Sequence, residues 1–252
     1  MGSEISQLEK VVMKIILLVL LAFNSFAFDQ THEAFDKVLK TYTSKKGSQV
    51  LVDYKSLAEN QGDLDTYLKQ LEALKKIEFN KFSKDEQLAF WINAYNAYTL
   101  KLIIKNYPVK SIKDIGGLFS GPWDQKFIYL MGKNMTLNKI EHGTIRKQFK
   151  EPRIHFAVNC ASIGCPSLLQ EAFVGSKLDT QLETATKNFL ANNEKNFYDK
   201  SKNTLFMSKI FKWYGGDFED KFGSKEQFIS KYIEFPKNAD TDYLDYNWNL
   251  NE

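Results

Sequence analysis

The chain has 252 residues and a formal net charge of +3, with 34 basic and 31 acidic side chains interspersed along the sequence. Hydrophobic residues make up 43% and charged residues 26%, which is typical of a globular protein and excludes a disordered one. Because the lysines and arginines form no basic block, we expect no nucleic-acid partner.

The N-terminus has the pattern of a secretory signal. Lys14 precedes an apolar run at 15–23, and Ser25-Phe26-Ala27 supplies small residues for cleavage after Ala27. The run is shorter than the ~20 residues that a comfortable membrane span needs. We expect residues 1–27 to be a signal peptide with an N-terminal extension, so that the mature chain is exported, periplasmic or secreted, and has no stable membrane span. An uncleaved N-terminal anchor is the alternative.

The half of the chain that follows is predicted to be mostly helical. Hydrophobic residues recur at helical spacing in 31–42, 54–58, 64–74 and 84–106. Ser83 and Glu86 have capping-box spacing at the start of the longest of these stretches, and Pro108 ends it. His32 is expected on the solvent-facing side of the first helix.

Turn-forming residues then separate shorter elements in the second half. We expect a β-hairpin at 126–137, helices at 138–149, 178–190 and 224–232, and strands at 153–159 and 205–207, the second of which leads into 209–214. Asn138 and Glu141 have the spacing of a second capping box. Residues 236–252 resemble a loosely held tail. The predicted class is α+β, with a helical N-terminal part packed on a small β-sheet with further helices, and residues 28–252 forming one domain.

Two asparagines stand in the most apolar part of the long helix, the segment 90–98 (FWINAYNAY). Asn93 and Asn96 are three residues apart, so they share a helix face. A buried amide must be hydrogen-bonded, or it costs about 1–3 kcal/mol. The two amides are therefore expected either to tie the helix to neighbouring main chain or to point into a pocket and orient a catalytic group.

The residues able to carry chemistry gather between positions 141 and 165. They are Glu141, His142, His155, Asn159, Cys160 and Cys165. A thiol becomes a useful nucleophile when a nearby imidazole lowers its pKa. The imidazole in turn needs an orienting carboxylate or amide. This combination indicates a cysteine-dependent active site.

Each of these residues also has a structural alternative. Glu141 stands at the reciprocal position of the capping box that Asn138 would open, and His155 could be a hydrogen-bonded core histidine. Cys160 and Cys165 are the only two cysteines of the chain, so in an exported protein a disulfide competes with a free reactive Cys160. A metal site built from these histidines and cysteines is a third alternative, although the spacing matches no recognised zinc pattern.

Four blocks of the sequence carry a family resemblance: 90–98, 140–142, 153–166 (RIHFAVNCASIGCP) and 211–214 (FKWY). They resemble the hallmark blocks of the DUF547 family, and the resemblance extends over about 54–232. A relation of this family to the thiol peptidase and transglutaminase-like group has been proposed, which implies a papain- or transglutaminase-like core with a cysteine, a histidine and a carboxylate at its centre. Carried over to this chain, the resemblance points to Cys160, His142 and Glu141, with His155 as the second candidate imidazole. A simple papain match is excluded, because every histidine precedes Cys160.

The first functional hypothesis is a cysteine-dependent hydrolase or acyl transferase that acts without a cofactor on a small-molecule or peptide substrate, such as an amide or a thiol-containing compound. Cys160 would attack as a thiolate, His142 would act as general base and then acid, and Glu141 or Asn93 would orient the imidazole. The main-chain N–H groups of 161–165 would supply an oxyanion site. The residues expected to contact the substrate are Trp91, Asn96, Trp123, Asn159, Cys165, Trp213 and Tyr214.

The second hypothesis is a non-catalytic exported binding module. In that case Cys160 and Cys165 would form a disulfide, and the asparagines and histidines would be structural. An aromatic-rich groove would then bind a peptide or a glycan. A redox role of the cysteine pair fits less well, because the pair lacks the Cys-x-x-Cys spacing of thioredoxin-like sites.

Overall fold

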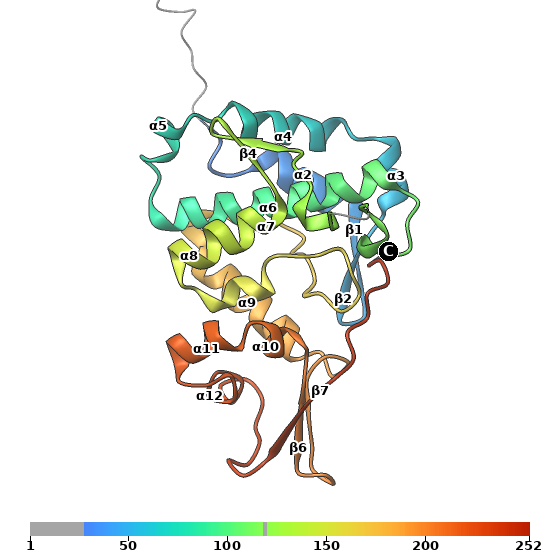
Figure 1. Ribbon diagram of the computed structural model, residues 1–252, viewed down its shortest axis with the longest axis vertical. Helices are drawn as coiled ribbons and strands as arrows, with labels where there is room; N and C mark the ends of the chain where they lie inside the picture. Colours follow the sequence, from blue (N-terminus) through green and yellow to red (C-terminus); the bar gives the residue numbers. More distant parts are fainter. Residues whose placement is uncertain (1–27, 118–119) are drawn as a thin grey trace, which may run out of the picture.

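The computed structural model describes residues 28–117 and 120–252 (Figure 1). The predicted signal peptide, 1–27, lies outside the described residues. Within them, helices predominate and the strands form three small sheets of two, two and three strands. The α+β class is therefore confirmed. None of the helices in the two described ranges is long and apolar enough to cross a membrane.

The upper part of the molecule in Figure 1 contains the predicted N-terminal helices. These are α2 (Glu33–Tyr42), α3 (Tyr54–Glu59), α4 (Gly62–Ala73) and α6 (Lys84–Asn106), while the short helix α5 (Lys76–Phe79) was not predicted. As predicted, Ser83 and Glu86 close a capping box at the start of α6, and the helix ends just before Pro108. A short hairpin of β1 (Thr43–Lys46) and β2 (Gln49–Val52) was not predicted.

The expected position of His32 was wrong. This residue precedes α2 and is buried, with its Nδ1 2.7 Å from the Tyr67 hydroxyl on α4. Tyr67 is fully buried and needs a hydrogen-bond partner for its hydroxyl. The polar ring of His32 meets that need, so it packs inward instead of facing solvent.

The middle of the chain forms a hairpin followed by a helix with an irregular centre. The predicted hairpin is present as β3 (Ile128–Leu130) and β4 (Lys133–Met135). The helix has three parts: α7 (Leu137–Ile140), a π-helical turn η3 (Glu141–Ile145) and α8 (Arg146–Phe149). Short 3₁₀ turns at η1 (Ile112–Asp114) and η2 (Pro122–Asp124) precede the hairpin.

The second capping box was predicted wrongly. The N-cap of α7 is Thr136, whose hydroxyl accepts from the main-chain N–H of Lys139 at 3.0 Å. The side chain of Asn138 donates instead to Asp124 at 2.7 Å. Glu141 is therefore free of a capping role and lies one turn inside the helix.

The strand predicted at 153–159 is absent. Residues Pro152–Phe156 form the 3₁₀ helix η4, with Pro152 in its first turn and the Glu151 side chain accepting from the main-chain N–H of Arg153. Proline is favoured at the first turn of a helix because its missing N–H would be unpaired there anyway. Since η4 packs against a helix and not beside a strand, its apolar run is buried without sheet pairing.

The lower part of the molecule combines four α-helices and one 3₁₀ helix with the three-stranded sheet (Figure 1). The elements are η5 (Gly175–Lys177), α9 (Leu178–Leu190), β5 (Phe197–Asp199), β6 (Thr204–Met207), α10 (Ile210–Trp213), α11 (Gly215–Phe222), α12 (Lys225–Ile229) and β7 (Asp240–Tyr243). Strand β6 lies in the middle of the sheet, antiparallel to β5 and parallel to β7. The predictions for 178–190, 205–207 and 224–232 are confirmed in type, and the segment 209–214, to which no type was assigned, contains α10.

The prediction of a loosely held tail was wrong. After β7 the chain runs upward beside the loop that contains the cysteines, and its end lies near β1 and β2 (Figure 1). The carbonyl of Asn247 accepts from Gly164 at 2.8 Å, and that of Asn251 accepts from Val52 at 2.8 Å. The side chain of Asn251 also accepts from the buried Tyr54 hydroxyl at 2.8 Å. The tail is therefore fixed by hydrogen bonds to segments far away in sequence.

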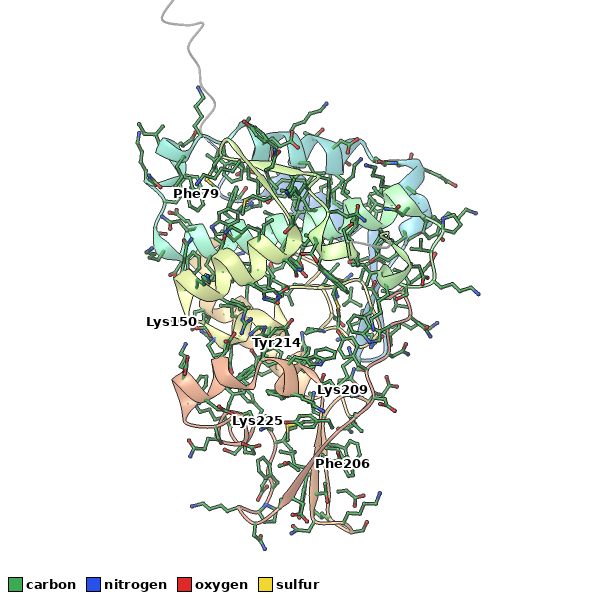
Figure 2. All side chains as sticks on the ribbon, in the orientation of Figure 1. Phe79, Lys150, Phe206, Lys209, Tyr214 and Lys225 are labelled. Atoms are coloured by element: carbon green, nitrogen blue, oxygen red, sulfur yellow. A yellow bond between two sulfur atoms is a disulfide. The ribbon has the colours of Figure 1, made fainter. Side chains whose placement is uncertain are left out.

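Two groups of buried apolar side chains fill the two parts of the structure. The first surrounds α6, which is buried on nearly all sides from Leu88 to Ile104. The second is rich in aromatic rings and contains Phe156, Phe189, Phe211, Phe218 and Phe228. Tyr214 lies where the two parts meet (Figure 2). This junction holds the candidate site.

Candidate functional site

A cavity of about 260 Å³ lies at this junction. Its aromatic lining consists of Tyr95, Trp123, Trp213, Tyr214, Tyr246 and Trp248. Its polar lining includes Asn138, Glu141, His142 and His155, and both cysteines reach its wall. A mostly apolar concave site with a few converging polar groups is the usual form of a small-ligand pocket.

The π-helical turn places two of these polar residues. A π turn contains one more residue than an α turn and shifts the following side chains around the helix axis, and such turns are frequent at functional sites. In η3 this arrangement brings Glu141 and His142 to the cavity together, with Glu141 buried and the His142 side chain 39% exposed. The two side chains lie 3.6 Å apart, between Oε1 and Nδ1.

His155 is held by a carboxylate that the sequence analysis did not identify. Its Nε2 lies 2.7 Å from Oδ2 of Asp217 on α11, and its ring stacks on Tyr214 with centroids 4.0 Å apart. Burial lowers the pKa of His155, against the opposing effect of the bond to Asp217, so the ring is neutral at pH 7. The other nitrogen, Nδ1, is buried and has no hydrogen-bond partner among the described residues. Since Nε2 donates to the carboxylate, Nδ1 carries the lone pair.

Arg146 balances the charge of Asp217. Its guanidinium donates to both carboxylate oxygens, at 2.6 and 2.8 Å, and to Nδ1 of His142 at 3.3 Å. Although burial opposes the shift, the hydrogen bonds from His155 and Arg146 hold the pKa of Asp217 well below its usual range. Asp217 is therefore ionised at neutral pH and keeps the His155 ring in one orientation.

Glu141 is embedded among tyrosines. Burial raises the pKa of Tyr95 and of Tyr214, and the charge of Glu141 together with hydrogen bonds to it adds to both shifts. Both hydroxyls therefore stay protonated and donate to the carboxylate. Glu141 is solvated by these protein groups at the wall of the cavity.

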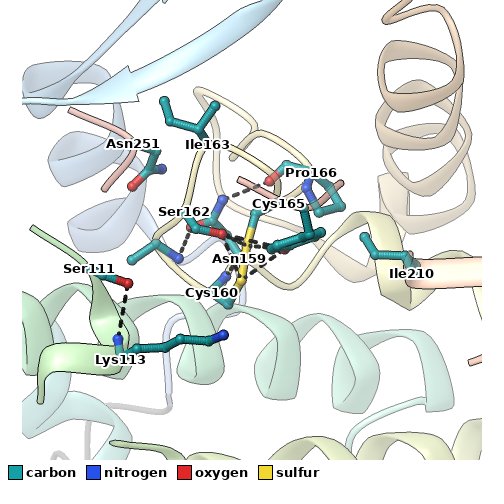
Figure 3. Close-up of a disulfide and its surroundings, with 12 residues drawn as sticks. Ser111, Lys113, Asn159, Cys160, Ser162, Ile163, Cys165, Pro166, Ile210 and Asn251 are labelled. Atoms are coloured by element: carbon teal, nitrogen blue, oxygen red, sulfur yellow. Dashed lines mark hydrogen bonds between the residues drawn. A yellow bond between two sulfur atoms is a disulfide. The ribbon is translucent and has the colours of Figure 1, made fainter. Parts of the chain in front are cut away.

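A disulfide joins Cys160 and Cys165, whose Cα atoms are 6.1 Å apart (Figure 3). Cys160 is partly exposed to the cavity and Cys165 is buried. The Tyr246 hydroxyl, from the C-terminal tail, lies 3.2 Å from each sulfur atom. The disulfide thus forms part of the cavity wall, and of the two cysteines Cys160 is the accessible one.

The loop around the disulfide is fixed by two asparagines. Asn96 on α6 donates to the carbonyl of Ala157 and accepts from the N–H of Asn159, both at 2.9 Å. Asn159 in turn donates to the carbonyl of Pro166 and accepts from the N–H of Ala161, both at 2.7 Å (Figure 3). Ala161, directly after Cys160, has a φ of 59°, which is unfavourable for a residue with a Cβ and persists only where the surroundings enforce it.

The cavity gathers most of the residues that the sequence analysis singled out. Those that line it are Glu141, His142, His155, Cys160, Cys165, Trp123, Trp213 and Tyr214. Asn96 and Asn159 lie behind the loop with their side chains engaged by main chain. Asn93 is further away: its amide donates to the carbonyl of Phe173 at 2.7 Å and accepts from the N–H of Phe173 at 2.9 Å. Trp91 packs against Phe79 in the upper core, so it does not wall the cavity.

Several residues of the site were missed. Tyr246 and Trp248 belong to the tail, where two aromatic residues within three positions were the available signal. Asp217 and Arg146 stand among many charged residues on amphipathic helices, and nothing in the sequence separates them from surface charges. In the described ranges, no cluster of three or more His, Cys, Asp or Glu side chains is arranged to hold a metal ion.

The comparisons with known proteins support the family resemblance. Residues 79–190 match the family model described as "Protein of unknown function, DUF547". The matched segment includes the blocks at 90–98, 140–142 and 153–166, while the block at 211–214 lies beyond it. Neither the curated proteins nor the solved structures gave a significant match.

Proposed function

We propose that this DUF547-like chain is a cysteine-dependent hydrolase or acyl transferase, related to the thiol peptidase and transglutaminase-like group, whose nucleophile is Cys160. The observation that carries the proposal is the His155–Asp217 pair, with Nε2 and Oδ2 2.7 Å apart, at the cavity that Cys160 also lines. An imidazole anchored by a carboxylate through one nitrogen and unpartnered at the other is the base arrangement of nucleophilic hydrolases.

His155 is the preferred general base. Its pKa is lowered, chiefly by burial, so the ring is neutral and can accept a proton at neutral pH. His142 is more exposed, and its Nδ1 already accepts a hydrogen bond from Arg146. His142 is thus better placed to meet solvent or the leaving group than to hold the thiol proton.

The proposed reaction starts from reduced cysteines. A dithiol reductant first supplies two electrons and two protons, which converts the disulfide to two thiols. His155 then takes the proton of Cys160, and the thiolate forms a bond to the carbonyl carbon of the acyl group. The bond from that carbon to the leaving amine or alcohol breaks, and the leaving group takes the proton from the imidazolium. Water, or an acceptor amine or alcohol, attacks the resulting thioester in the reverse manner and releases the thiol.

The Tyr246 hydroxyl supports this chemistry, because it lies 3.2 Å from the sulfur of Cys160. A hydroxyl at this distance can donate to a thiolate and stabilise its charge. The proposal also places the protein outside the cytoplasm. It is supported there by the signal-like pattern of the N-terminus and by the disulfide, a bond that persists in oxidising compartments.

The test is site-specific acylation. Cys165→Ser leaves Cys160 as a single free thiol and removes the need for a reductant. We expect this variant to form an acetyl adduct on Cys160 with p-nitrophenyl acetate, and to be alkylated by iodoacetamide well below pH ~8.5, the usual thiol pKa. Peptide mass spectrometry measures both reactions. Cys160→Ser, which leaves only the buried Cys165, is the matched control and should react slowly.

Two further variants identify the base. Adding Asp217→Asn to Cys165→Ser should slow acylation at least tenfold and raise the apparent pKa of alkylation, whereas adding His142→Gln should change them much less. A Cys160 thiol that reacts no faster than free cysteine at every pH would refute the enzyme proposal.

A non-catalytic binding module remains the second candidate, because the disulfide itself favours it. If neither cysteine of the wild-type chain is alkylated after mild reduction, and both react only after unfolding, the disulfide is structural. The cavity then serves binding alone.

A further inference from the structure

Four aromatic rings form a continuous wall of the cavity. Ring centroids are 4.8 Å apart between Trp213 and Tyr246, 4.6 Å between Tyr246 and Trp248, and 6.0 Å between Trp248 and Trp123. The rings come from three separate segments: η2, α10 and the C-terminal tail. Aromatic faces carry partial negative charge and attract cations, most strongly in tryptophan.

The same cavity has a carboxylate. Among the described residues that line it, Glu141 is the only aspartate, glutamate, lysine or arginine. The nearby Arg146 does not line the cavity and is bound by Asp217 through two hydrogen bonds. With both lining histidines counted as neutral, the net formal charge of the lining is therefore that of Glu141.

Charge and desolvation select the ligand. An anion would meet Glu141, and no lysine or arginine lines the cavity to offset that charge. An uncharged ligand would displace water from the cavity without gaining any attraction from the charge of Glu141. A cation gains both the carboxylate and the ring faces.

The chain itself shows that this wall attracts an ammonium. The Nζ atom of Lys113 lies 3.8 Å from the centroid of the Trp248 ring, although Lys113 does not line the cavity. One face of Trp248 is thus already in contact with an alkylammonium group.

We infer that the cavity binds an alkylammonium group, with the charge near Glu141 and the alkyl chain along the rings of Trp213, Tyr246 and Trp248. A cavity of about 260 Å³ lies just below the range of roughly 300–1,000 Å³ that is usual for ligand pockets, so it suits one such group better than a drug-sized molecule. Resting on the proposed function, the inference assigns this group to the substrate: a primary amine that accepts the acyl group, or the side chain of a lysine residue in a peptide.

Binding can be tested without catalysis in the disulfide-bonded protein. Three of the four tryptophans line the cavity, so intrinsic fluorescence reports its occupation. The probes are n-pentylamine for a free amine and Nα-acetyl-lysine N-methylamide for a lysine side chain. Their uncharged counterparts are 1-pentanol and Nα-acetyl-norleucine N-methylamide.

At least one of the two amines is expected to bind at least tenfold more tightly than its uncharged counterpart. Glu141→Gln, whose side chain can still accept hydrogen bonds from Tyr95 and Tyr214, should weaken amine binding at least tenfold. Trp213→Leu, at a side chain that is 44% exposed, should also weaken amine binding. It is the alternative test if Glu141→Gln does not fold. Glu171→Gln, at an exposed position outside the cavity, is the control and should bind as the wild type does.

The two amines distinguish the source of the ammonium. If only pentylamine binds, the natural ligand is a free amine. If the lysine derivative binds, with or without pentylamine, the site also accepts a lysine side chain of a peptide. Equal binding of charged and uncharged probes, or no binding of either amine, would overturn the inference. Amine binding combined with an unreactive Cys160 would keep the inference and reject the enzyme, whereas acylation without amine binding would do the reverse.

Discussion

The Oδ2 atom of Asp217 lies 2.7 Å from Nε2 of His155, so a carboxylate on α11 holds an imidazole on η4 across 62 residues of chain. The same carboxylate binds Arg146 on α8, which donates to both of its oxygens. Asp217 thereby fixes the orientation of His155 and cancels the charge of Arg146. The loss of this one side chain should affect both the stability of the fold and the chemistry of the cavity.

Asp217→Asn is predicted to lower the free energy of unfolding by about 1–2 kcal/mol at pH 7. Hydrogen bonds to charged groups contribute roughly 1.5–3 kcal/mol, and the partial exposure of Asp217 reduces that value through solvent screening. The folded-state pKa of Asp217 is depressed below the ordinary 3.8, so its contribution is present above pH 3.8 and is lost as the pH falls below it. Urea denaturation at pH 7 and pH 3 should therefore show the difference from wild type shrinking at the lower pH.

Asp220→Asn is the control for this change. Asp220 is exposed on the same helix, and its substitution should alter stability by less than about 0.5 kcal/mol. If Asp217→Asn is as stable as the wild type at pH 7, the carboxylate does not anchor the site.

The two asparagines of α6 should have similar effects on the stability of the fold but different effects on the reactivity of the disulfide. Asn93 and Asn96 each make two hydrogen bonds to buried main chain, so replacement of either by alanine should cost about 2–4 kcal/mol. Asn96 holds residues 157–159, directly before Cys160, whereas Asn93 holds Phe173. Only Asn96→Ala should change the rate at which dithiothreitol reduces the Cys160–Cys165 disulfide.

Reduction is measured by quenched alkylation and mass spectrometry at a temperature where both variants are folded. Asn106→Ala, at the exposed C-terminal end of the same helix, controls for a general loss of helix stability. Equal reduction rates in Asn93→Ala and Asn96→Ala would show that Asn96 does not position the disulfide loop.

The elements that were predicted correctly are those whose formation depends on residues close together in the sequence. Helix α6 has its capping box and its apolar faces within one stretch of chain, and the hairpin at 128–135 has its turn residues between two short strands. Residues 153–159 lacked such a cause, because a short apolar run fits a strand or a buried helical turn equally well. The choice of η4 depends on packing against α9, which the sequence does not show.

The same distinction applies to the site. Glu141, His142, His155 and the cysteines lie within 25 residues, so their proximity in space was predictable from their proximity in the chain. Asp217 and Tyr246 reach the cavity from distant segments, and their contacts with His155 and Cys160 are properties of the tertiary fold alone. The tail looked loose because its order depends on hydrogen bonds to the loop at 163–164 and to Val52.

The buried His32 predicts a loss of stability in weak acid. Burial lowers its pKa from 6.5 to about 4. Between these values the unfolded chain binds a proton that the folded chain does not, so the free energy of unfolding falls as the pH drops from about 6.5 to 4, by roughly 2–3 kcal/mol from this residue. His32→Gln keeps a polar partner for Tyr67 and should lack this part of the pH dependence.

Urea denaturation at pH 7 and pH 4.5 measures the effect as a difference between the two proteins. The comparison is needed because burial also lowers the pKa of His155, which adds a similar dependence in both. His142→Gln, at a side chain that is 39% exposed, is the control. Parallel pH profiles for wild type and His32→Gln would contradict the prediction.

Lys195 makes a prediction of the same sign for alkaline pH. Its side chain is buried, donates to the carbonyl of Cys165 and has a pKa lowered from 10.5 to about 8, mainly by desolvation. Between pH 8 and 10.5 the unfolded chain keeps a proton that the folded chain has released. The free energy of unfolding should therefore rise with pH across this interval, by roughly 2–3 kcal/mol from this residue.

Lys195→Met should lack this rise, because methionine fills a similar space without a titrating group. The variant loses the hydrogen bond to Cys165 but also the cost of burying a charge, so its free energy of unfolding at pH 7 should be close to that of the wild type. By pH 9.5 the wild type should be the more stable of the two. Lys187→Met, at a 64% exposed side chain on α9, should follow the wild-type profile. If the free energy of unfolding changes between pH 7.5 and 9.5 by the same amount in the wild type and in Lys195→Met, the prediction is wrong. The ammonium of Lys195 would then stay charged and solvated in the folded protein.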